Sequence, residues 1–104
     1  MKKIICIDAG HGGKDSGAVN GKRYEKDDNL RLGLAVGQLL LNQGLSVVYT
    51  RTTDKTVSLQ ERSNFANEKQ ADLYLSLHRN SYITSSACGI ENWIYQYTDK
   101  TTEQ

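Results

Sequence analysis

The chain has 104 residues, a length that fits one small domain. Its 13 lysines and arginines nearly balance 12 aspartates and glutamates, and the formal net charge is +1 at pH 7. This balance gives no electrostatic reason to expect binding to nucleic acid or to an anionic membrane surface, and no apolar run approaches the ~20 residues of a membrane-spanning helix.

The first strand is expected at Lys3–Asp8, which is mostly apolar and β-branched, as in a strand that is covered on both faces. Cys6 lies inside this run and is expected to be a buried, small hydrophobic residue. Cys88 precedes a glycine in a turn-prone stretch, and the sequence favours neither a disulfide with Cys6 nor a role as zinc ligand. The polar, glycine-rich stretch from Gly10 to Asp28 predicts a long functional loop.

A first helix is expected to be capped by Asp27 or Asp28 and to run to about Gln43, with Gly44 as its C-terminal cap. The spacing of its apolar residues predicts one broad inward face, made of Leu30, Leu34, Val36, Leu39, Leu40 and Leu41.

The second half of the chain repeats the alternation of strand and helix. A second strand is expected at Leu45–Thr50, and Ser58 to Glu61 has the capping-box pattern that opens a second helix, ending near Lys69. The residues of this helix expected to point inward are Leu59, Phe65 and Ala66. Further strands are expected at Asp72–Leu77 and Ile90–Tyr97. The order β-α-β-α-β-β predicts an α/β fold with a mostly parallel, mixed sheet and helices on both faces.

Three residues that bind metals well are expected to meet at one edge of this sheet. The two histidines of the chain, His11 and His78, each follow a predicted strand, and Glu25 precedes the first predicted helix. In open α/β sheets, ligand sites form outside the carboxyl ends of the strands. Two imidazoles and one carboxylate, with a fourth position left to water, are the usual ligands of a hydrolytic zinc site.

Other interpretations remain open for each residue taken alone. The glycine loop could cradle a phosphate, but the Walker pattern fails, because Asp8 stands six residues before Lys14 where glycine is required. The dinucleotide fingerprint fails as well, because Asp15 occupies the place of its third glycine. His78 alone could be a structural histidine, and Glu25 alone could be a solvated surface charge.

Several stretches together resemble one known family over nearly the whole chain. They are residues 7–18 (IDAGHGGKDSGA), 25–30 (EKDDNL), 49–51 (YTR), 59–67 (LQERSNFAN) and 72–80 (DLYLSLHRN). In this order they resemble the type-3 family of zinc-dependent N-acetylmuramoyl-L-alanine amidases, which cleave bacterial peptidoglycan.

The resemblance implies a Zn²⁺ site at His11, Glu25 and His78, and hydrolysis of the amide between N-acetylmuramic acid and L-alanine. Residues 1–104 would form the N-terminal part of an amidase domain that continues further in the family. The family's catalytic glutamate lies in that later part, and neither Glu91 nor Glu103 matches its motif, so the catalytic residue stays unassigned. The alternative is a non-catalytic zinc-binding or wall-binding fragment.

Residues around the expected site have more modest predictions. Asn80 is a candidate for substrate binding, and Arg79 replaces a residue that is usually small in the family, which would make the rim of the site more basic. Arg51 and Arg62 are expected to form structural ion pairs. The aromatic residues of the last strand are expected to serve mainly in packing, with Trp93 as a weaker candidate for stacking on a sugar.

The expected partner is peptidoglycan, with no nucleic acid and no membrane. Only four apolar residues follow the basic N-terminus before Asp8, whereas a signal peptide needs roughly 7–15. The resemblance implies action at the cell wall, outside the cell, and the missing signal-peptide pattern favours release by lysis or another route. A sheet left partly uncovered would favour a homodimer or a swapped assembly.

Overall fold

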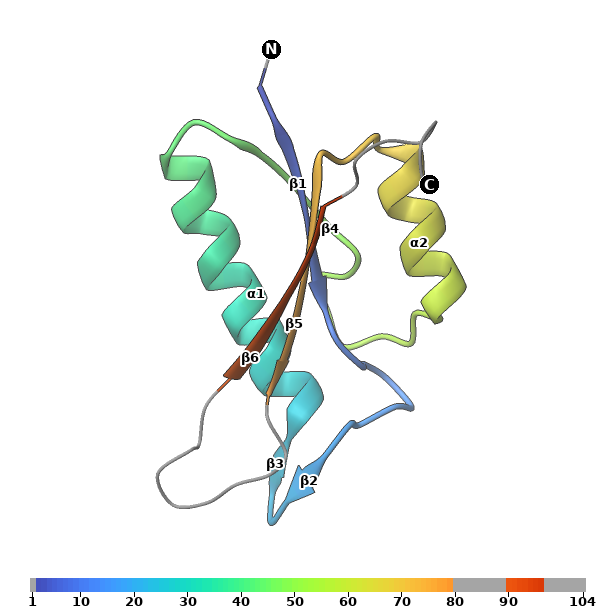
Figure 1. Ribbon diagram of the computed structural model, residues 1–104. Helices are drawn as coiled ribbons and strands as arrows, with labels where there is room; N and C mark the ends of the chain where they lie inside the picture. The colour runs from blue at the N-terminus through green and yellow to red at the C-terminus, as the bar shows by residue number, and fades with distance from the viewer. Residues whose placement is uncertain (1, 80–89, 97–104) are drawn as a thin grey trace.

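The computed structural model describes residues 2–79 and 90–96, the latter by their backbone alone. The elements follow in the order β1 (Ile4–Ala9), β2 (Val19–Asn20), β3 (Arg23–Tyr24), α1 (Glu25–Asn42), β4 (Ser46–Tyr49), α2 (Leu59–Glu68), β5 (Leu73–Arg79) and β6 (Ile90–Gln96). The predicted main strands and helices are all present (Figure 1). The small β2–β3 hairpin was not predicted and lies within the stretch expected to be a loop.

The main sheet has the strand order β4-β1-β5-β6. Strand β1 pairs in parallel with both β4 and β5, whereas β6 runs antiparallel to β5. The prediction of a mostly parallel, mixed sheet is therefore confirmed. Because β1 and β5 run in the same direction, their carboxyl ends share one edge of the sheet.

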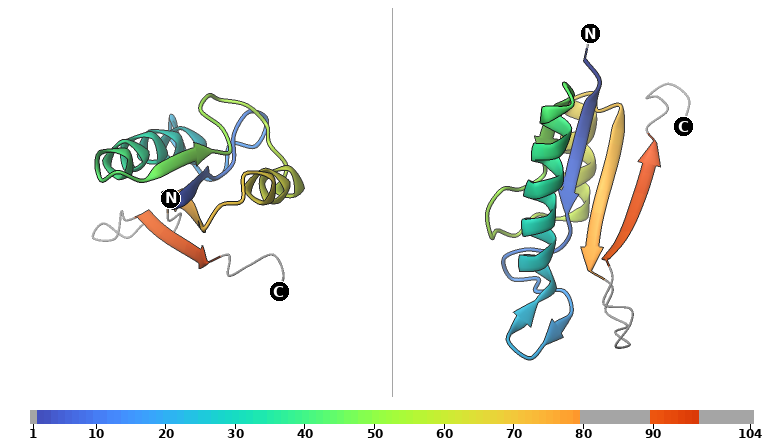
Figure 2. Two further views of the ribbon diagram at one scale, coloured as in Figure 1. Left: turned by 90° about the horizontal axis from the view of Figure 1, so that it is seen from above. Right: turned by 90° about the vertical axis from the view of Figure 1, so that its left-hand side faces the viewer.

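The two helices cover opposite faces of this sheet, as predicted (Figures 1 and 2). Successive side chains of a strand point to opposite faces, so β1 contributes to both cores. Ile5 and Ile7 lie in the core under α1, and Cys6 lies in the core under α2 with Ala66. Cys6 is fully buried, as expected, and burial raises the pKa of its thiol to about 12. A buried thiol of this kind is inert.

Helix α1 begins three to four residues earlier than predicted. Its first residue is Glu25, and the preceding Tyr24 makes no side-chain capping bond. The N–H of Glu25 instead donates to the carbonyl of Ala18 at 2.8 Å. A loop carbonyl thus satisfies a free N–H of the first turn, so a cap at Asp27 or Asp28 is not required.

The inward face of α1 was only partly predicted. Val36 and Leu40 pack against the core as expected. The leucines at 34, 39 and 41 are 40%, 64% and 44% exposed, so their predicted inward position was wrong. The buried stripe instead follows a spacing of four residues through Asn29, Gly33 and Gly37, and the two glycines let the helix lie close to the sheet.

Helix α2 opens with the predicted capping box. The Ser58 hydroxyl accepts from the N–H of Glu61 at 3.0 Å, and the Glu61 carboxylate accepts from the N–H of Ser58 at 2.7 Å. Ala66 is buried and Phe65 packs beside it, as predicted. Leu59 was predicted to point inward, but it is 83% exposed because it is the first residue of the helix and lies beyond the end of the core.

Strand β5 is two residues longer at its end than predicted. Its antiparallel partner β6 pairs His78 with Glu91 and Arg79 with Ile90. His78 therefore lies within the strand rather than after it. Among the described residues, no helix is both long enough and apolar enough to cross a membrane.

Candidate metal centre

His11, Glu25 and His78 come together at the carboxyl edge of the sheet. His11 follows β1 by two residues, Glu25 is the first residue of α1, and His78 lies near the end of β5. One potential ligand atom from each of the three lies within 4.8 Å of the others. The sequence argument from strand ends selected these three residues, and in the structure they form a group that could hold a metal ion.

Both imidazoles face the same carboxylate oxygen. Glu25 Oε2 lies 3.2 Å from His11 Nε2 and 3.1 Å from His78 Nδ1. The two rings are nearly perpendicular, with centroids 5.2 Å apart and an interplanar angle of 85°. Two nitrogens and one oxygen therefore converge from three separate segments of the chain.

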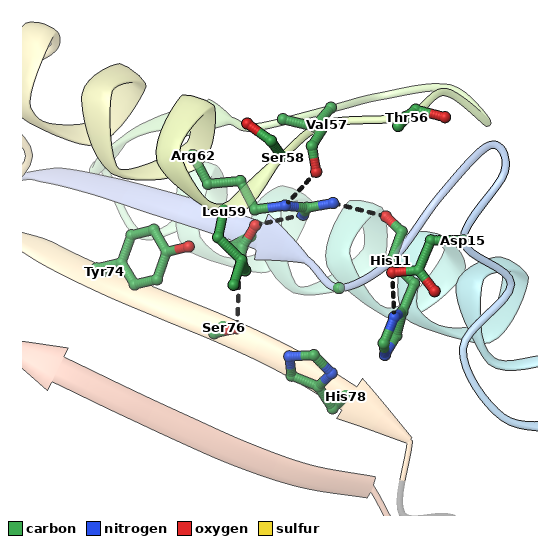
Figure 3. Close-up of a pocket in the computed structure, with 12 residues that line it drawn as sticks. His11, Asp15, Thr56, Val57, Ser58, Leu59, Arg62, Tyr74, Ser76 and His78 are labelled. Carbon is green, nitrogen blue, oxygen red and sulfur yellow. Dashed lines mark hydrogen bonds and ion pairs between the residues drawn. The ribbon is translucent and has the colours of Figure 1, made fainter.

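The other ring nitrogen of His11 is already engaged. His11 Nδ1 lies 2.8 Å from Asp15 Oδ2, and Figure 3 shows this contact at one end of a cleft. When Nδ1–H donates to Asp15, the neutral ring presents the lone pair of Nε2 towards Glu25. Two acceptors at 3.2 Å repel one another, and a cation between them removes that repulsion. A carboxylate that orients a metal-binding histidine in this way is common in metalloproteins.

Glu25 is buried but is held in its ionised form. Burial alone would raise the pKa of its carboxyl, yet hydrogen bonds outweigh this effect and lower the pKa overall. The Ala18 N–H donates to Oε1 at 3.0 Å, and the Asn29 amide donates to Oε2 at 3.2 Å. An ionised carboxylate is the form that binds a metal.

The backbone of the glycine loop is fixed by two buried arginines. His11 has a positive φ of 64°, a conformation that is uncommon for a residue with a side chain. Arg62 donates to the His11 carbonyl at 2.7 Å, and Arg51 donates to the Gly10 carbonyl at 3.1 Å. Arg62 also pairs with Asp8, as predicted. Arg51 was expected to form an ion pair, but in the described part of the chain its guanidinium bonds to backbone carbonyls only.

Asp8 is the centre of a buried polar cluster behind the site. Its carboxylate accepts from Arg62 at 2.6 Å, from Thr50 at 2.8 Å and from Ser76 at 2.9 Å. Burial alone would raise the pKa of Asp8, but the hydrogen bonds from Tyr74 and Arg62 outweigh it and lower the pKa. This cluster ties β1, β5, α2 and the residue after β4 together beneath the candidate ligands.

Two glycines leave the room that the candidate ligands need. A side chain at Gly10 would clash with the imidazole of His78. Gly17 has a φ of 68°, and a Cβ atom there would lie 2.6 Å from the His11 ring and 2.8 Å from the Glu25 carboxylate. The glycine-rich loop therefore serves close packing around the three side chains, a role that spacing alone did not reveal.

A cleft of about 590 Å³ extends from the two histidines along the start of α2. Figure 3 shows Leu59 and Tyr74 on the walls of this cleft, away from His11 and His78. The lining residues are Asp8, Gly10, His11, Asp15, Thr56, Val57, Ser58, Leu59, Arg62, Tyr74, Ser76 and His78. Its size is typical of a site for a small molecule or a short segment of polymer.

The sequence suggested that Arg79 would make the rim of the site more basic, and this prediction was wrong. It is buried, and its guanidinium donates to Asp28 at 2.6 Å and to the Ala18 carbonyl at 3.0 Å. Its charge is therefore neutralised inside the protein. Asn80, the predicted substrate-binding residue, lies outside the described residues, as do Cys88 and Glu103, and Trp93 is described by its backbone alone.

Asn29 is a site residue that sequence reasoning missed. Its side chain is buried and contacts Glu25 directly. The available signal was its spacing, because a residue four positions after Glu25 lies on the same face of a helix. A polar residue at an inward helix position requires hydrogen-bond partners, and these turn out to lie at the site.

The chain is similar in sequence to several known proteins. A family described as N-acetylmuramoyl-L-alanine amidase matches residues 5–104. The amidase CwlM of Bacillus licheniformis is 45% identical over 93 residues, which cover 88% of this chain and 36% of that protein. The sporulation-specific N-acetylmuramoyl-L-alanine amidase of Bacillus subtilis is 43% identical, with 88% and 35% covered.

A solved structure shares the fold. The catalytic domain of CwlV, an N-acetylmuramoyl-L-alanine amidase from Bacillus (Paenibacillus) polymyxa var. colistinus, superposes with a TM-score of 0.75 and 42% identity. The match covers 82% of this chain and 49% of that domain. The chain thus spans less than half the length of each of these three relatives.

Proposed function

The chain belongs to the N-acetylmuramoyl-L-alanine amidase family, and on this premise we propose that it hydrolyses the amide between N-acetylmuramic acid and L-alanine in peptidoglycan. The observation that carries the proposal is the convergence of His11, Glu25 and His78 within 4.8 Å at the end of a cleft. An amidase needs a site that activates water beside a groove that admits a polymer segment, and a candidate metal site beside a cleft at this edge of the sheet supports such a function.

Zinc is the metal that suits this donor set. Imidazole nitrogens and a carboxylate oxygen are its common ligands in hydrolytic sites. His11 Nε2, His78 Nδ1 and Glu25 Oε2 would hold the ion, and Asp15 would keep the His11 ring in the required tautomer. When bound at such a site, zinc supplies an acidified water and polarises a carbonyl group.

The residues of the chain have separate tasks in this proposal. The three ligands hold the ion at one end of the cleft, while Leu59 and Tyr74 line the part that would receive the substrate. Asn80 follows β5 directly and would contact the stem peptide. A general acid–base contributes roughly 10²–10⁴-fold to the rate of such a reaction, and that role stays unassigned here.

One observation favours the second candidate, a zinc-binding or wall-binding module with little activity. Among the described residues that line the cleft, both carboxylates already have partners: Asp8 is bonded to Arg62, and Asp15 is bonded to His11. Neither is free to move a proton between water and a leaving amine. The two candidates share the metal site and differ only in turnover.

Digestion of purified peptidoglycan tests the proposal. The amidase is expected to release stem peptides with new N-terminal L-alanine, and His11→Ala is expected to abolish this release and the bound zinc. Zinc binding and wall binding without new L-alanine termini would establish the second candidate. A wild-type chain that does not bind zinc, does not bind the wall and does not cleave it would refute both.

We further propose that the protein acts at the cell wall, outside the cytoplasm. This follows from the substrate, because the amide in question lies in the wall polymer. Fractionation of cells with an antibody against the chain tests this expectation, and a signal confined to the cytoplasm before lysis and absent from the wall afterwards would contradict it.

A further inference from the structure

One buried side chain touches all three segments that carry the candidate ligands. Asn29 is 1% exposed. Its amide donates to the Gly10 carbonyl, next to His11, at 3.0 Å, and to Glu25 Oε2 itself at 3.2 Å. Its carbonyl oxygen accepts from the N–H of Arg79, next to His78, at 2.7 Å.

These bonds use both kinds of polar group that asparagine offers. The NH₂ group supplies two donors and the carbonyl oxygen accepts, so a single side chain fits two acceptors on one side and one donor on the other. An aspartate would bring an acceptor against Glu25, and an apolar residue would leave the Gly10 carbonyl and the Arg79 N–H without these partners. The pattern is specific to an amide of this length.

The consequence concerns the direction of the Glu25 carboxylate. The Asn29 donor lies against Oε2, the same oxygen that faces both imidazoles, while Oε1 is held by the Ala18 N–H. With both oxygens held, the carboxylate has one orientation. Gly10 and Arg79 adjoin the two histidines in sequence, so the same amide also fixes the separation of β1 and β5 at this point.

We propose that Asn29 is a positioning residue that sets the affinity and the coordination geometry of the metal centre. The inference rests on the proposed metal site and adds a residue that neither binds the ion nor touches the substrate. Partners that orient metal ligands typically change metal affinity by roughly 10–100-fold when they are removed, and Asn29 acts on all three ligand segments at once.

The test compares Asn29→Ala with Thr50→Val in the full 104-residue chain. Thr50 is a matched control, because it is also buried and also donates a side-chain hydrogen bond, but to Asp8. Zinc affinity is measured by competition with a chromophoric chelator, on protein whose folding is verified by circular dichroism. We expect roughly 10–100-fold weaker zinc binding for Asn29→Ala and an unchanged affinity for Thr50→Val.

Cobalt(II) provides a readout that a merely structural role would not change. Its visible absorption depends on the number and arrangement of its ligands, so the spectrum of Asn29→Ala is expected to differ from wild type while that of Thr50→Val does not. Unchanged zinc affinity and an unchanged cobalt spectrum in folded Asn29→Ala would overturn the proposal.

Two further measurements keep the outcome decisive. If Asn29→Ala does not fold, Asn29→Ser replaces it, and the side-chain amide of Asn29 in the wild type is followed by NMR during zinc addition. Its resonances are expected to shift and its exchange with solvent to slow, and the absence of both changes would overturn the role. A wild-type chain with no affinity for zinc would instead refute the proposed function, which separates the two failures.

Discussion

His11 and Asp15 form a contact within one loop: Nδ1 of the imidazole lies 2.8 Å from Oδ2 of the carboxylate. Only Nε2 of the ring is then left to face Glu25. The hydrogen bond with His11 is also the main cause of the lowered pKa of Asp15. The exposed carboxylate of Asp15 therefore determines which ring nitrogen of His11 faces the candidate metal site.

Replacing Asp15 should weaken metal binding without unfolding the protein. We expect Asp15→Ala to bind zinc about tenfold more weakly, because the ring of His11 loses its orienting partner. The side chain of Asp15 is 62% exposed, so the free energy of unfolding should change little. Chelator competition measures the first effect and urea denaturation the second.

Asp15→Asn is the matched control, because its amide oxygen can still accept from Nδ1. Its zinc affinity should lie between those of wild type and Asp15→Ala. Equal affinity in all three proteins would show that the contact has no role at the metal centre.

The stability of the metal-free protein should fall in acid through Asp8. Its pKa is lower in the folded protein than its ordinary value of 3.8. A carboxyl of this kind contributes stability that is present above the unfolded-state pKa and is lost as the pH falls through the folded-state pKa. Urea unfolding in the presence of a chelator should therefore show a decline in stability below about pH 4.

Asp8→Asn should reduce that decline and should also destabilise the protein at pH 7. Removing the carboxylate leaves the buried guanidinium of Arg62 without its counter-charge, which typically costs about 3–5 kcal/mol. Glu68→Gln, at an exposed position of α2, is the control and should change neither quantity. An Asp8→Asn protein with the wild-type acid profile would contradict the assignment.

The parts predicted best from sequence depend on periodicity and on the topology of strands. A nearly continuous apolar run located β1 and a strand-like apolar pattern located β5, and the rule for strand ends then brought His11 and His78 together. Glu25 was included because it stands at the start of a helix that faces the same edge. These inferences need no side-chain detail.

The parts that failed depend on contacts between distant side chains. Leu59 and Leu39 were expected to point inward from the pattern of apolar residues in each helix, but one lies beyond the end of the core and the other lies on the outer side of α1. Asn29 was missed because its partners come from three segments that no local pattern connects. Arg79 was expected at the rim, and only the position of Asp28 explains its burial.

Leu59 should contribute to substrate binding rather than to folding. It is 83% exposed and lines the cleft, so substrate bound there would cover it. We expect Leu59→Ala to bind a soluble muramoyl peptide about fivefold more weakly, equivalent to about 1 kcal/mol of lost apolar contact, with unchanged zinc content. Leu39→Ala is the control, because Leu39 is also an exposed leucine but lies on α1. Isothermal titration calorimetry measures the affinity of each variant for the muramoyl peptide, and equal affinities of Leu59→Ala and Leu39→Ala would show that the cleft is not the binding site.

The chain should self-associate at high concentration. Within the described part, β4 and β6 are the edge strands of the sheet, and α1 exposes the leucines noted above. Unpaired strand edges and exposed apolar patches both favour contacts between chains. Light scattering is expected to give the mass of a dimer, and Leu39→Lys should lower the measured mass if α1 forms the contact. A monomer at all concentrations would contradict this expectation.

Zinc should stabilise the folded protein by mass action, since the three ligands lie on segments that separate on unfolding. A ligand at about 100 times its Kd adds about 2.7 kcal/mol to the free energy of unfolding. For a domain of this size, each kcal/mol raises Tm by roughly 4–8 °C, so calorimetry should show an increase of about 10–20 °C. His78→Ala should abolish the increase, because it removes one of the two imidazoles. Magnesium is the control, because it prefers oxygen ligands in octahedral geometry, and it should leave Tm unchanged. An equal rise of Tm with both cations would show that the stabilisation does not come from this nitrogen-rich site.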